Sequence, residues 1–318
     1  MSDLVPKSDC DTKIANQAIE TCMNQTACSS FSQFTLLLNR SGKSINDFIL
    51  AYPDDKKCLE PALKGIENDT DIPKLWGFGV VGRCTAVEIQ IANLLEVLFP
   101  GRFAFVLFSL GNHRIMYCTK TGVIIDSSFP EGSVLSRGNE WIGHPGSDKQ
   151  CKVSENGTKI ETMREDSKGK ASRFPYPTVH HSSDKPLEPR GGMIRCLQDF
   201  AANPKLVVLF RSVGNDLLTY RSKMEWKFAT KNEAKLKLLT EDKGHESVTT
   251  IVWRKGQESS PAAEAQCHQV FNNFVKDHGG PYGATQWDAD LQSTHQALWK
   301  ACNECLDCLP QVEPPEVK

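Results

Sequence analysis

Residues 82–129 read GRCTAVEIQIANLLEVLFPGRFAFVLFSLGNHRIMYCTKTGVIIDSSF. In the first third of this stretch, apolar residues recur at the spacing of one helix face: Val87, Ile91, Leu94, Leu95 and Leu98. The spacing predicts an amphipathic helix that begins near Cys84 and ends before Pro100-Gly101. Three short apolar runs follow, over residues 103–110, 113–119 and 123–129, with tight turns between them. The stretch therefore predicts a helix packed on a meander of antiparallel strands.

The sequence on either side predicts an α+β fold with helical covers from both ends of the chain. Residues 1–73 carry apolar residues at helical spacing, and we interpret them as an N-terminal cover rather than a separate domain. Residues 193–318 contain four strand patterns followed by two helices, and we expect them to complete the same domain as residues 74–129. These strands either extend the first sheet or form a second one.

Residues 130–192 differ from the rest of the chain. They are rich in Gly, Ser, Pro, Lys and Glu and poor in apolar residues, which predicts mainly loop. One hairpin is expected in CKVSENGTKIET, residues 151–162, because Asn156-Gly157 suits a type I′ turn. A connection of this length inside a compact protein is usually functional or disordered, and our hypothesis is a lid or a substrate channel here.

The composition is typical of a globular protein in water and excludes several functions. The chain has 318 residues, of which 39% are apolar and 24% charged, and its net charge of −2 gives no basic field for nucleic acid. No apolar run approaches the roughly 20 residues that span a bilayer. The N-terminus lacks the apolar segment of a signal peptide, so we expect a cytoplasmic protein whose 12 cysteines are mostly buried thiols. A disulfide set is the alternative if the protein is secreted, and the oligomeric state is left open.

Gly77, Gly79 and Gly82 form G-x-G-x-x-G, the pattern of a dinucleotide-binding turn. That pattern requires an apolar strand before the first glycine, whereas NDTDIPKLW, residues 68–76, is polar and contains a proline. It also requires an acidic residue about 20 positions further on, where Arg102 lies instead. The glycines are better explained by a close approach to the start of the helix, and no cofactor is expected.

Cys84 is the strongest candidate for chemistry. It lies where the helix begins, and the unpaired N–H groups and the dipole of a helix start both lower a thiol pKa. A nucleophilic thiol also needs a base and a group that orients the base. His113 opens the second strand and Asp126 lies near the end of the third. If these strands pair through the turn at 120–122, paired positions sum to about 240, and Asp126 becomes a near neighbour of His113.

This arrangement resembles the core of the transglutaminase-like superfamily, which includes peptide N-glycanases, transglutaminases and, more distantly, arylamine N-acetyltransferases. The shared pattern is G-x-C at a helix start, a His that opens a strand and an Asp on the following strand. Glycanase-type members are also similar in Gly-Arg-Cys and in a pair like Ala92-Asn93. The spacings of 29 residues from Cys84 to His113 and 13 from His113 to Asp126 suit that core. The resemblance covers residues 76–129 only.

The resemblance implies a role for each matching residue. Cys84 would be the nucleophile of acyl transfer through a thioester, His113 its acid and base, and Asp126 the group that orients His113. The Cys84 N–H would donate to the oxyanion, with the Trp76 indole as a second candidate donor. Thr85 departs from the Trp or Gly of many members, which affects the acyl pocket. The expected substrate is an amide or thioester, attacked by water or an amine; the alternative is a binding protein with a retired triad.

Two further groups could bind ligands but are better explained structurally. One is a C-x-x-C-x-x-C pattern with a histidine two turns before it: His295, Cys302, Cys305 and Cys308. Thiolates at this spacing can hold zinc or an iron–sulfur cluster, but a fourth cysteine is missing nearby, and we expect a Cys-rich helix packed on the core and no metal. The other is the pair His180-His181, which lies in the polar segment and is expected to be solvated.

Overall fold

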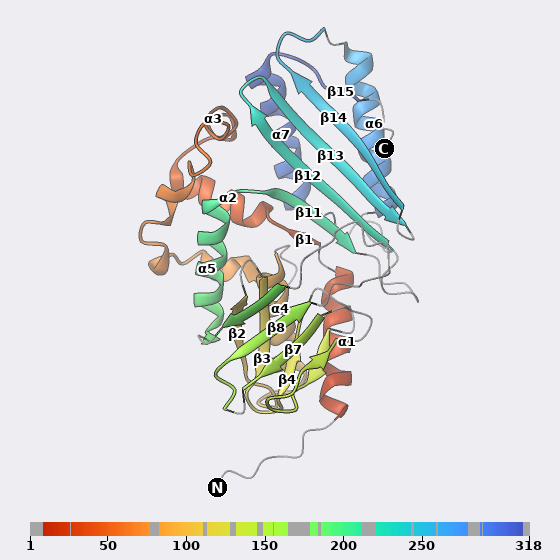
Figure 1. Cartoon of the computed structure of the whole chain (residues 1–318). Helices are drawn as coiled ribbons and strands as arrows, with labels where there is room; N and C mark the ends of the chain where they lie inside the picture. Colours follow the sequence, from red (N-terminus) through yellow and green to blue (C-terminus); the bar gives the residue numbers. More distant parts are fainter. Residues whose placement is uncertain are drawn as a thin grey trace.

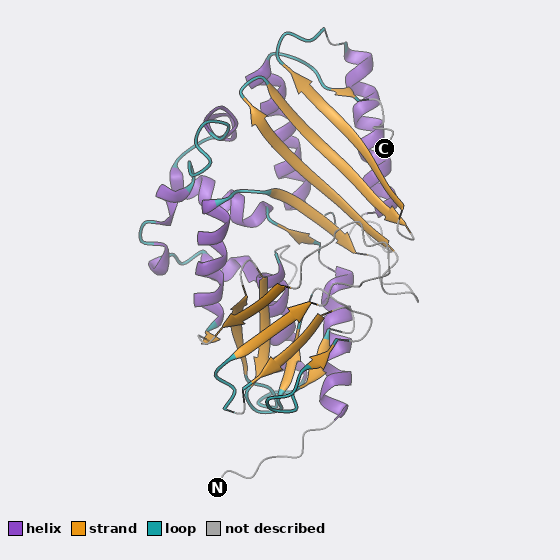
Figure 2. Cartoon of the chain, in the orientation of Figure 1, coloured by secondary structure: helices purple, strands orange, loops and turns teal. Residues whose placement is uncertain are grey.

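The protein is an α+β fold of three antiparallel sheets with helices around them (Figure 2). The computed structural model describes residues 9–25, 27–76, 83–110, 113–127, 132–144, 149–154, 156–164, 179–183, 186–211, 220–242, 245–258, 260–278, 287 and 289–313. A five-stranded sheet and a four-stranded sheet form the lower part of the molecule in Figure 1, and a six-stranded sheet forms the upper part.

The five-stranded sheet has the order β10-β2-β3-β4-β5, and its centre is the predicted meander. The strands are β2 (Phe105–Leu110), β3 (His113–Cys118), β4 (Val123–Ile125), β5 (Ser133–Leu135) and β10 (Pro186–Leu187). β3 pairs with β4 so that Met116 lies opposite Ile125, a positional sum of 241 against the expected 240. The predicted helix is α4 (Cys84–Leu98), and it packs on β3.

The two faces of this sheet bury different sets of side chains, because successive residues of a strand point to opposite faces. Leu107, Met116 and Ile125 belong to the main hydrophobic core, which also contains the buried side of α4. Phe108, Ile115, Tyr117 and Ile124 face the other way and form a second, smaller core with residues of the four-stranded sheet. The catalytic segment expected from sequence is therefore enclosed on both sides.

The N-terminal segment is helical, as predicted, with one exception. The helices are α1 (Asp9–Gln25), α2 (Phe31–Ser41), α3 (Ile45–Ala51) and the 3₁₀ turns η1 (Glu60–Leu63), η2 (Ile66–Asn68) and η3 (Ile72–Trp76). Between α1 and α2, residues Cys28 and Ser29 form a short strand, β1. β1 pairs with the six-stranded sheet, whereas α1 packs on α4 and β5 (Figure 1). The N-terminal cover thus spans both parts of the molecule.

The polar segment 130–192 contains more regular structure than its composition predicts. Besides β5 and β10, it forms a sheet of order β6-β7-β8-β9 from β6 (Ile142–Gly143), β7 (Lys149–Val153), β8 (Ile160–Arg164) and β9 (Val179–Ser183). The expectation of mainly loop is wrong here because few apolar residues are enough when a sheet buries only one face. Residues 165–178, in which a lid was also expected, lie outside the described part of the chain.

The predicted hairpin joins β7 to β8, but its turn differs from type I′. The Ser154 N–H donates to the Lys159 carbonyl at 2.8 Å, so four residues lie between the paired positions, whereas a type I′ hairpin turn has two. The Asn156 side chain stabilises the turn instead, since its Oδ1 accepts hydrogen bonds from the Thr158 N–H and from the hydroxyl groups of Ser154 and Thr158.

The C-terminal strands form a second sheet rather than an extension of the first. Its order is β1-β11-β12-β13-β14-β15, from β11 (Leu206–Arg211), β12 (Tyr220–Thr230), β13 (Glu233–Asp242), β14 (His245–Arg254) and β15 (Gln311–Val312). The two predicted helices, α6 (Pro261–His278) and α7 (Ala289–Leu306), cover one face of it (Figure 1). The sequence patterns did not predict the helix at residues 189–202, α5 (Pro189–Ala202).

One hydrophobic core continues from α4 and its sheet into the C-terminal part. It contains Leu95 of α4, Phe200 of α5, Trp226 of β12 and Trp299 of α7. The two sheets are therefore joined by packing as well as by the chain. In the described ranges, every helix is too short or too polar to cross a bilayer.

Replacing Gly157 by alanine is expected to destabilise the protein by about 1–2 kcal/mol. An added Cβ would lie 2.9 Å from Cε1 of the buried Tyr117 ring, in a backbone conformation with a φ of +69°. Urea unfolding of the wild type and of Gly157→Ala measures the difference. Gly143→Ala is the control, because nothing lies within 4 Å of its added Cβ, and equal losses in both variants would contradict the argument.

Candidate active site

Cys84 is the first residue of α4, and its side chain is partly exposed. The preceding residue, Arg83, has an extended backbone and offers no side-chain oxygen to cap the helix. Its carbonyl accepts the N–H groups of Ala86 and Val87. The start of a helix presents N–H groups and the positive end of the helix dipole, so the beginning of α4 favours negative charge at Cys84.

His113 and Asp126 are in direct contact. His113 Nε2 and Asp126 Oδ1 lie 2.9 Å apart, with the Asp126 side chain fully buried and 23% of the His113 side chain exposed. The main chain holds both residues, since His113 pairs with Leu110 across the β2–β3 turn and the Asp126 N–H donates to the Gly132 carbonyl at 2.8 Å. The neighbourhood expected from the strand register is therefore present.

The electrostatics of this pair extend to Cys84. Burial by itself lowers the pKa of His113. Four interactions raise this pKa and outweigh burial: the charge of Asp126, the hydrogen bond to Asp126, the hydrogen bond to Cys84 and the charge of Cys84. The net result raises the pKa of His113 to about 10. A protonated imidazole at neutral pH favours a thiolate on Cys84, which is the nucleophilic form of the side chain. Cys84, His113 and Asp126 thus form one continuous row of contacts.

A fourth titratable residue, Glu88, lies one helical turn after Cys84. Its side chain is completely buried, and its donor atoms and those of His113 and Asp126 lie within 4.8 Å of one another. Burial raises the pKa of Glu88 well above its usual range, the charges of Asp126 and Cys84 add to this, and His113 and the Ser127 N–H oppose it. Burial therefore favours the protonated, uncharged form of the Glu88 carboxyl group.

Only one oxygen of Glu88 has a hydrogen-bond partner within the described residues. Oε1 accepts from the Ser127 hydroxyl at 3.4 Å, whereas Oε2 is buried without a partner. The sequence analysis did not identify Glu88. The available signal was a single acidic residue inside the apolar pattern of the helix, four positions after Cys84 and so on the same helix face.

The same three side chains, Glu88, His113 and Asp126, could hold a divalent cation. Two carboxylates and an imidazole are suitable donors for zinc or manganese. Binding would require His113 and Asp126 to exchange their mutual hydrogen bond for the metal, so a bound cation would disable the row of contacts. The sulfur pattern at the C-terminus does not form such a group in the described part of the chain.

Two further thiols lie close to Cys84. The sulfur of Cys28, on β1, is 4.0 Å from the sulfur of Cys84. Cys196, on α5, makes a hydrogen bond to Thr85. Burial raises the pKa of Cys196, and the charge of Cys84 also acts to raise it. Sequence analysis could not find Cys28, because 56 residues separate it from Cys84 and no local pattern relates the two.

Trp76 ends η3, is partly buried and packs against the main core. η3 in turn packs on α4. Residues 77–82, which connect Trp76 to Arg83, lie outside the described part of the chain, and so do the three glycines of the G-x-G-x-x-G pattern. The proposed role of the Trp76 indole as an oxyanion donor stays a prediction.

The remaining candidates have structural surroundings. Cys302 and Cys308 are buried in the main core, and Cys305 is directed at the Asn46 carbonyl at 3.8 Å. The His295 ring stacks on Phe271, with ring centres 3.8 Å apart, and burial lowers the pKa of His295 to about 3. This arrangement is that of a Cys-rich helix packed on the core. The side chains of His180 and His181, on β9, are outside the described part.

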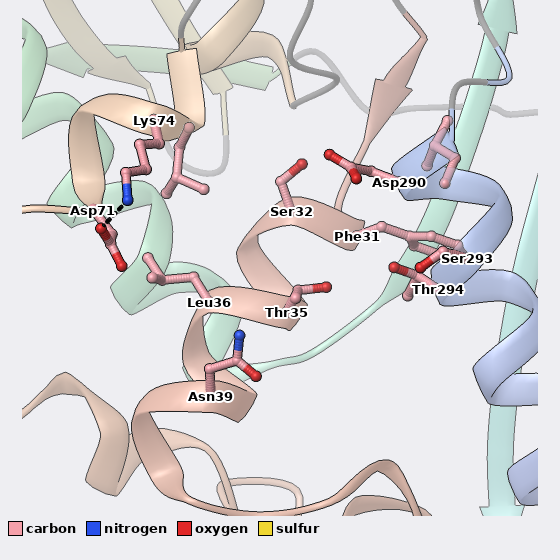
Figure 3. A pocket seen from close by; sticks show the side chains of 12 residues that line it. Phe31, Ser32, Thr35, Leu36, Asn39, Asp71, Lys74, Asp290, Ser293 and Thr294 are labelled. Carbon is pink, nitrogen blue, oxygen red and sulfur yellow. Dashed lines mark hydrogen bonds and ion pairs between the residues drawn. The ribbon is translucent and has the colours of Figure 1, made fainter.

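A cavity of about 380 Å³ is lined in part by the beginning of α2 (Figure 3). Its walls come from α2, η3 and α7, and they combine apolar side chains with hydroxyl, amide and charged groups. Phe31 and Ser32 line it, three and four residues after Cys28. Since a chain advances at most about 3.6 Å per residue, the cavity wall starts within roughly 11 Å of Cys28 along the backbone.

The reactivity of Cys84 tests the row of contacts. Iodoacetamide is expected to label Cys84 at pH 6.5 about tenfold faster than the exposed Cys10, because its thiolate persists below the free-thiol pKa of about 8.5. His113→Ala removes the positive charge and is expected to slow the labelling of Cys84 but not of Cys10. Rates are read for each cysteine by peptide mass spectrometry. Equal rates at the two sites, unaffected by His113→Ala, would show that the pair is not formed.

The charge state of Glu88 predicts a pH dependence of stability. The unfolded chain releases this proton above about pH 4.5, whereas the folded chain retains it, so the free energy of unfolding falls as pH rises above that value. Glu88→Gln keeps the shape of the acid but cannot ionise. The variant is expected to gain stability relative to the wild type by at most about 1.4 kcal/mol per pH unit. Urea unfolding from pH 5 to 8 measures this, with the exposed Glu20→Gln as control; parallel curves for Glu88→Gln and wild type would contradict it.

Comparison of the chain with protein-family models, with curated proteins and with solved structures finds no match. The resemblance to the transglutaminase-like superfamily thus stays a prediction from the residues of the segment 76–129.

Proposed function

We propose that this protein catalyses acyl transfer through a thioester on Cys84. The observation that supports the proposal is the continuous row from the Cys84 thiol through the His113 ring to the buried Asp126 carboxylate. A cysteine, a base and a group that orients the base, held in contact on three different elements, are the parts that nucleophilic acyl transfer needs. The reaction requires no cofactor.

The steps follow from these groups. The Cys84 thiolate attacks the carbonyl carbon of an amide or thioester, and the N–H groups at the start of α4 stabilise the oxyanion. His113, protonated at neutral pH, gives its proton to the leaving amine or thiol, and Asp126 keeps the ring in the required orientation. His113 then removes a proton from water or from an amine, which attacks the thioester and releases Cys84. Water gives hydrolysis, and an amine gives a new amide.

Glu88 supports this assignment of roles through its neutrality. A second ionised carboxylate within 4.8 Å of the His113 and Asp126 donor atoms would compete for the imidazolium and repel the thiolate. As a neutral acid, Glu88 leaves Asp126 as the single anionic partner of His113. Its place on the Cys84 face of α4 keeps the nucleophile next to an uncharged wall.

The cavity of Figure 3 is the proposed site for part of the substrate. It begins next to the chain segment that carries Cys28, whose sulfur lies 4.0 Å from the nucleophile. Its lining of Leu36, Leu75 and Thr35, with the Asp71–Lys74 ion pair at the edge, suits a chain with apolar and hydrogen-bonding groups. A peptide segment has this mixed character. We also propose a reducing, intracellular compartment, since nine of the 12 cysteines are buried, as expected of thiols that serve as small apolar groups.

Trapping of the acyl-enzyme tests the proposal. Wild-type protein mixed with p-nitrophenyl acetate is expected to release a burst of p-nitrophenol and to gain one acetyl group on Cys84, seen by intact-protein and peptide mass spectrometry. Cys84→Ser is expected to lose the adduct, and His113→Ala to slow its formation by on the order of 10²–10⁴-fold. Cys10→Ser is the matched control and is expected to react like the wild type.

A binding protein with a retired triad is the outcome that would replace this proposal. It is indicated if Cys84 gains no acetyl group, or if acetylation spreads over exposed cysteines and is indifferent to His113→Ala. The ester supplies an activated acyl group, so the experiment does not depend on knowledge of the natural substrate.

A further inference from the structure

The contact between Cys28 and Cys84 suggests chemistry beyond acyl transfer. The two sulfur atoms lie 4.0 Å apart, close enough for either thiol to donate a hydrogen bond to the other. Cys28 is only 6% exposed, whereas Cys84 is partly exposed at the start of α4. An activated, accessible cysteine thus has a second, protected thiol directly beside it.

The environment of Cys84 also favours reaction with oxidants. The thiolate is the form that peroxides oxidise, and the positive charge of His113 and the helix start stabilise it. A sulfenic acid formed on Cys84 has two fates: further oxidation, which is irreversible, or condensation with a nearby thiol. The position of Cys28 makes the second route available.

We propose that Cys28 is a resolving thiol, which forms a reversible disulfide with Cys84 when the protein meets a hydroperoxide. The formation of the disulfide is independent of the acyl chemistry. Only the description of Cys84 as a catalytic nucleophile rests on the proposed function. The pair therefore protects the nucleophile from irreversible oxidation.

The reaction balances in two steps. The Cys84 thiolate attacks the hydroxyl oxygen of ROOH, the O–O bond breaks, and the alkoxide takes a proton from His113 and leaves as ROH. Sulfur loses two electrons and the peroxide gains them, leaving a sulfenic acid. The Cys28 sulfur then attacks the sulfenic sulfur, an S–S bond forms, and hydroxide leaves with the Cys28 proton as water. A dithiol then reduces the disulfide to the two thiols by thiol–disulfide exchange and is itself oxidised to a disulfide.

The geometry asks for a small movement. A disulfide needs its sulfur atoms about 2.05 Å apart, so they must approach by about 2 Å, which rotation of the two side chains can provide. The main chain at Cys28 is held by pairing with Leu209 of β11, and the neighbouring Ser30 hydroxyl donates to the Lys205 carbonyl at 2.6 Å. The bond would join the edge of the six-stranded sheet to the catalytic helix.

Cys196 is the alternative resolving thiol and makes the proposal specific. It also senses the charge of Cys84, but its side chain is hydrogen-bonded to Thr85, and burial raises its pKa. A high pKa keeps it in the thiol form, which attacks slowly. Cys28 has its sulfur in contact with the sulfur of Cys84, and Cys28 is therefore the predicted partner.

Peptide mapping of the full-length wild type tests the assignment without any variant. The protein is treated with a small excess of hydrogen peroxide, alkylated, digested without reductant and analysed by mass spectrometry. The expected product is a cross-linked peptide pair that contains Cys28 and Cys84 and separates on treatment with dithiothreitol. A cross-link from Cys84 to Cys196, or Cys84 found only as sulfinic or sulfonic acid, would overturn the proposal.

Variants then separate the disulfide from the acyl chemistry. Cys28→Ala is expected to keep the basal labelling of Cys84 by iodoacetamide, but after peroxide and dithiothreitol to recover less than about a tenth of it, because Cys84 is over-oxidised. Cys196→Ala is the matched control and is expected to recover like the wild type; recovery by Cys28→Ala would overturn the proposal. A Cys28–Cys84 cross-link in a protein that forms no acyl-enzyme would support the disulfide and contradict only the proposed function.

Discussion

The charge on His113 is the interaction on which the site depends. A buried imidazolium is unfavourable alone. It is stabilised here because Asp126 lies 2.9 Å from one ring nitrogen and because Cys84 contributes a hydrogen bond and a favourable charge interaction. Asp126 is fully buried, so its attraction to His113 is little screened by water. The His113 imidazolium attracts the Asp126 carboxylate and favours a thiolate on Cys84, and a buried charge at any of these positions would be unfavourable without an opposite charge beside it.

This dependence explains why the surrounding structure is closely packed. Arg114, fully buried next to His113, donates to the His113 carbonyl at 3.1 Å and pairs with Asp199 of α5 at 2.6 Å. The five-stranded sheet has apolar side chains on both faces, which limits the access of water to its edge near Asp126. The neutral Glu88 completes the wall without adding a charge.

β1 connects the two parts of the molecule. Two residues of the N-terminal segment, Cys28 and Ser29, join the edge of the six-stranded sheet, while the helices before and after them pack on different parts of the protein. The site is thus formed where the two parts meet, with Cys84 from the lower part beside Cys28 from the upper part. A movement between the two parts would change the distance between these thiols and the entrance of the cavity.

The sequence by itself determined the helix that begins at Cys84, the meander after it and the neighbourhood of His113 and Asp126, because periodicity and short turns fix contacts between residues close along the chain. It did not determine the four-stranded sheet in the polar segment, the helix at 189–202 or the neutrality of Glu88. These three features depend on which faces of the helices and strands become buried. The residue pattern of one segment does not show which other segment covers it. The approach of Cys28 to Cys84 across 56 residues was decided only by the tertiary structure, because pairing of β1 with β11 and packing of α4 bring together two segments that share no local signal.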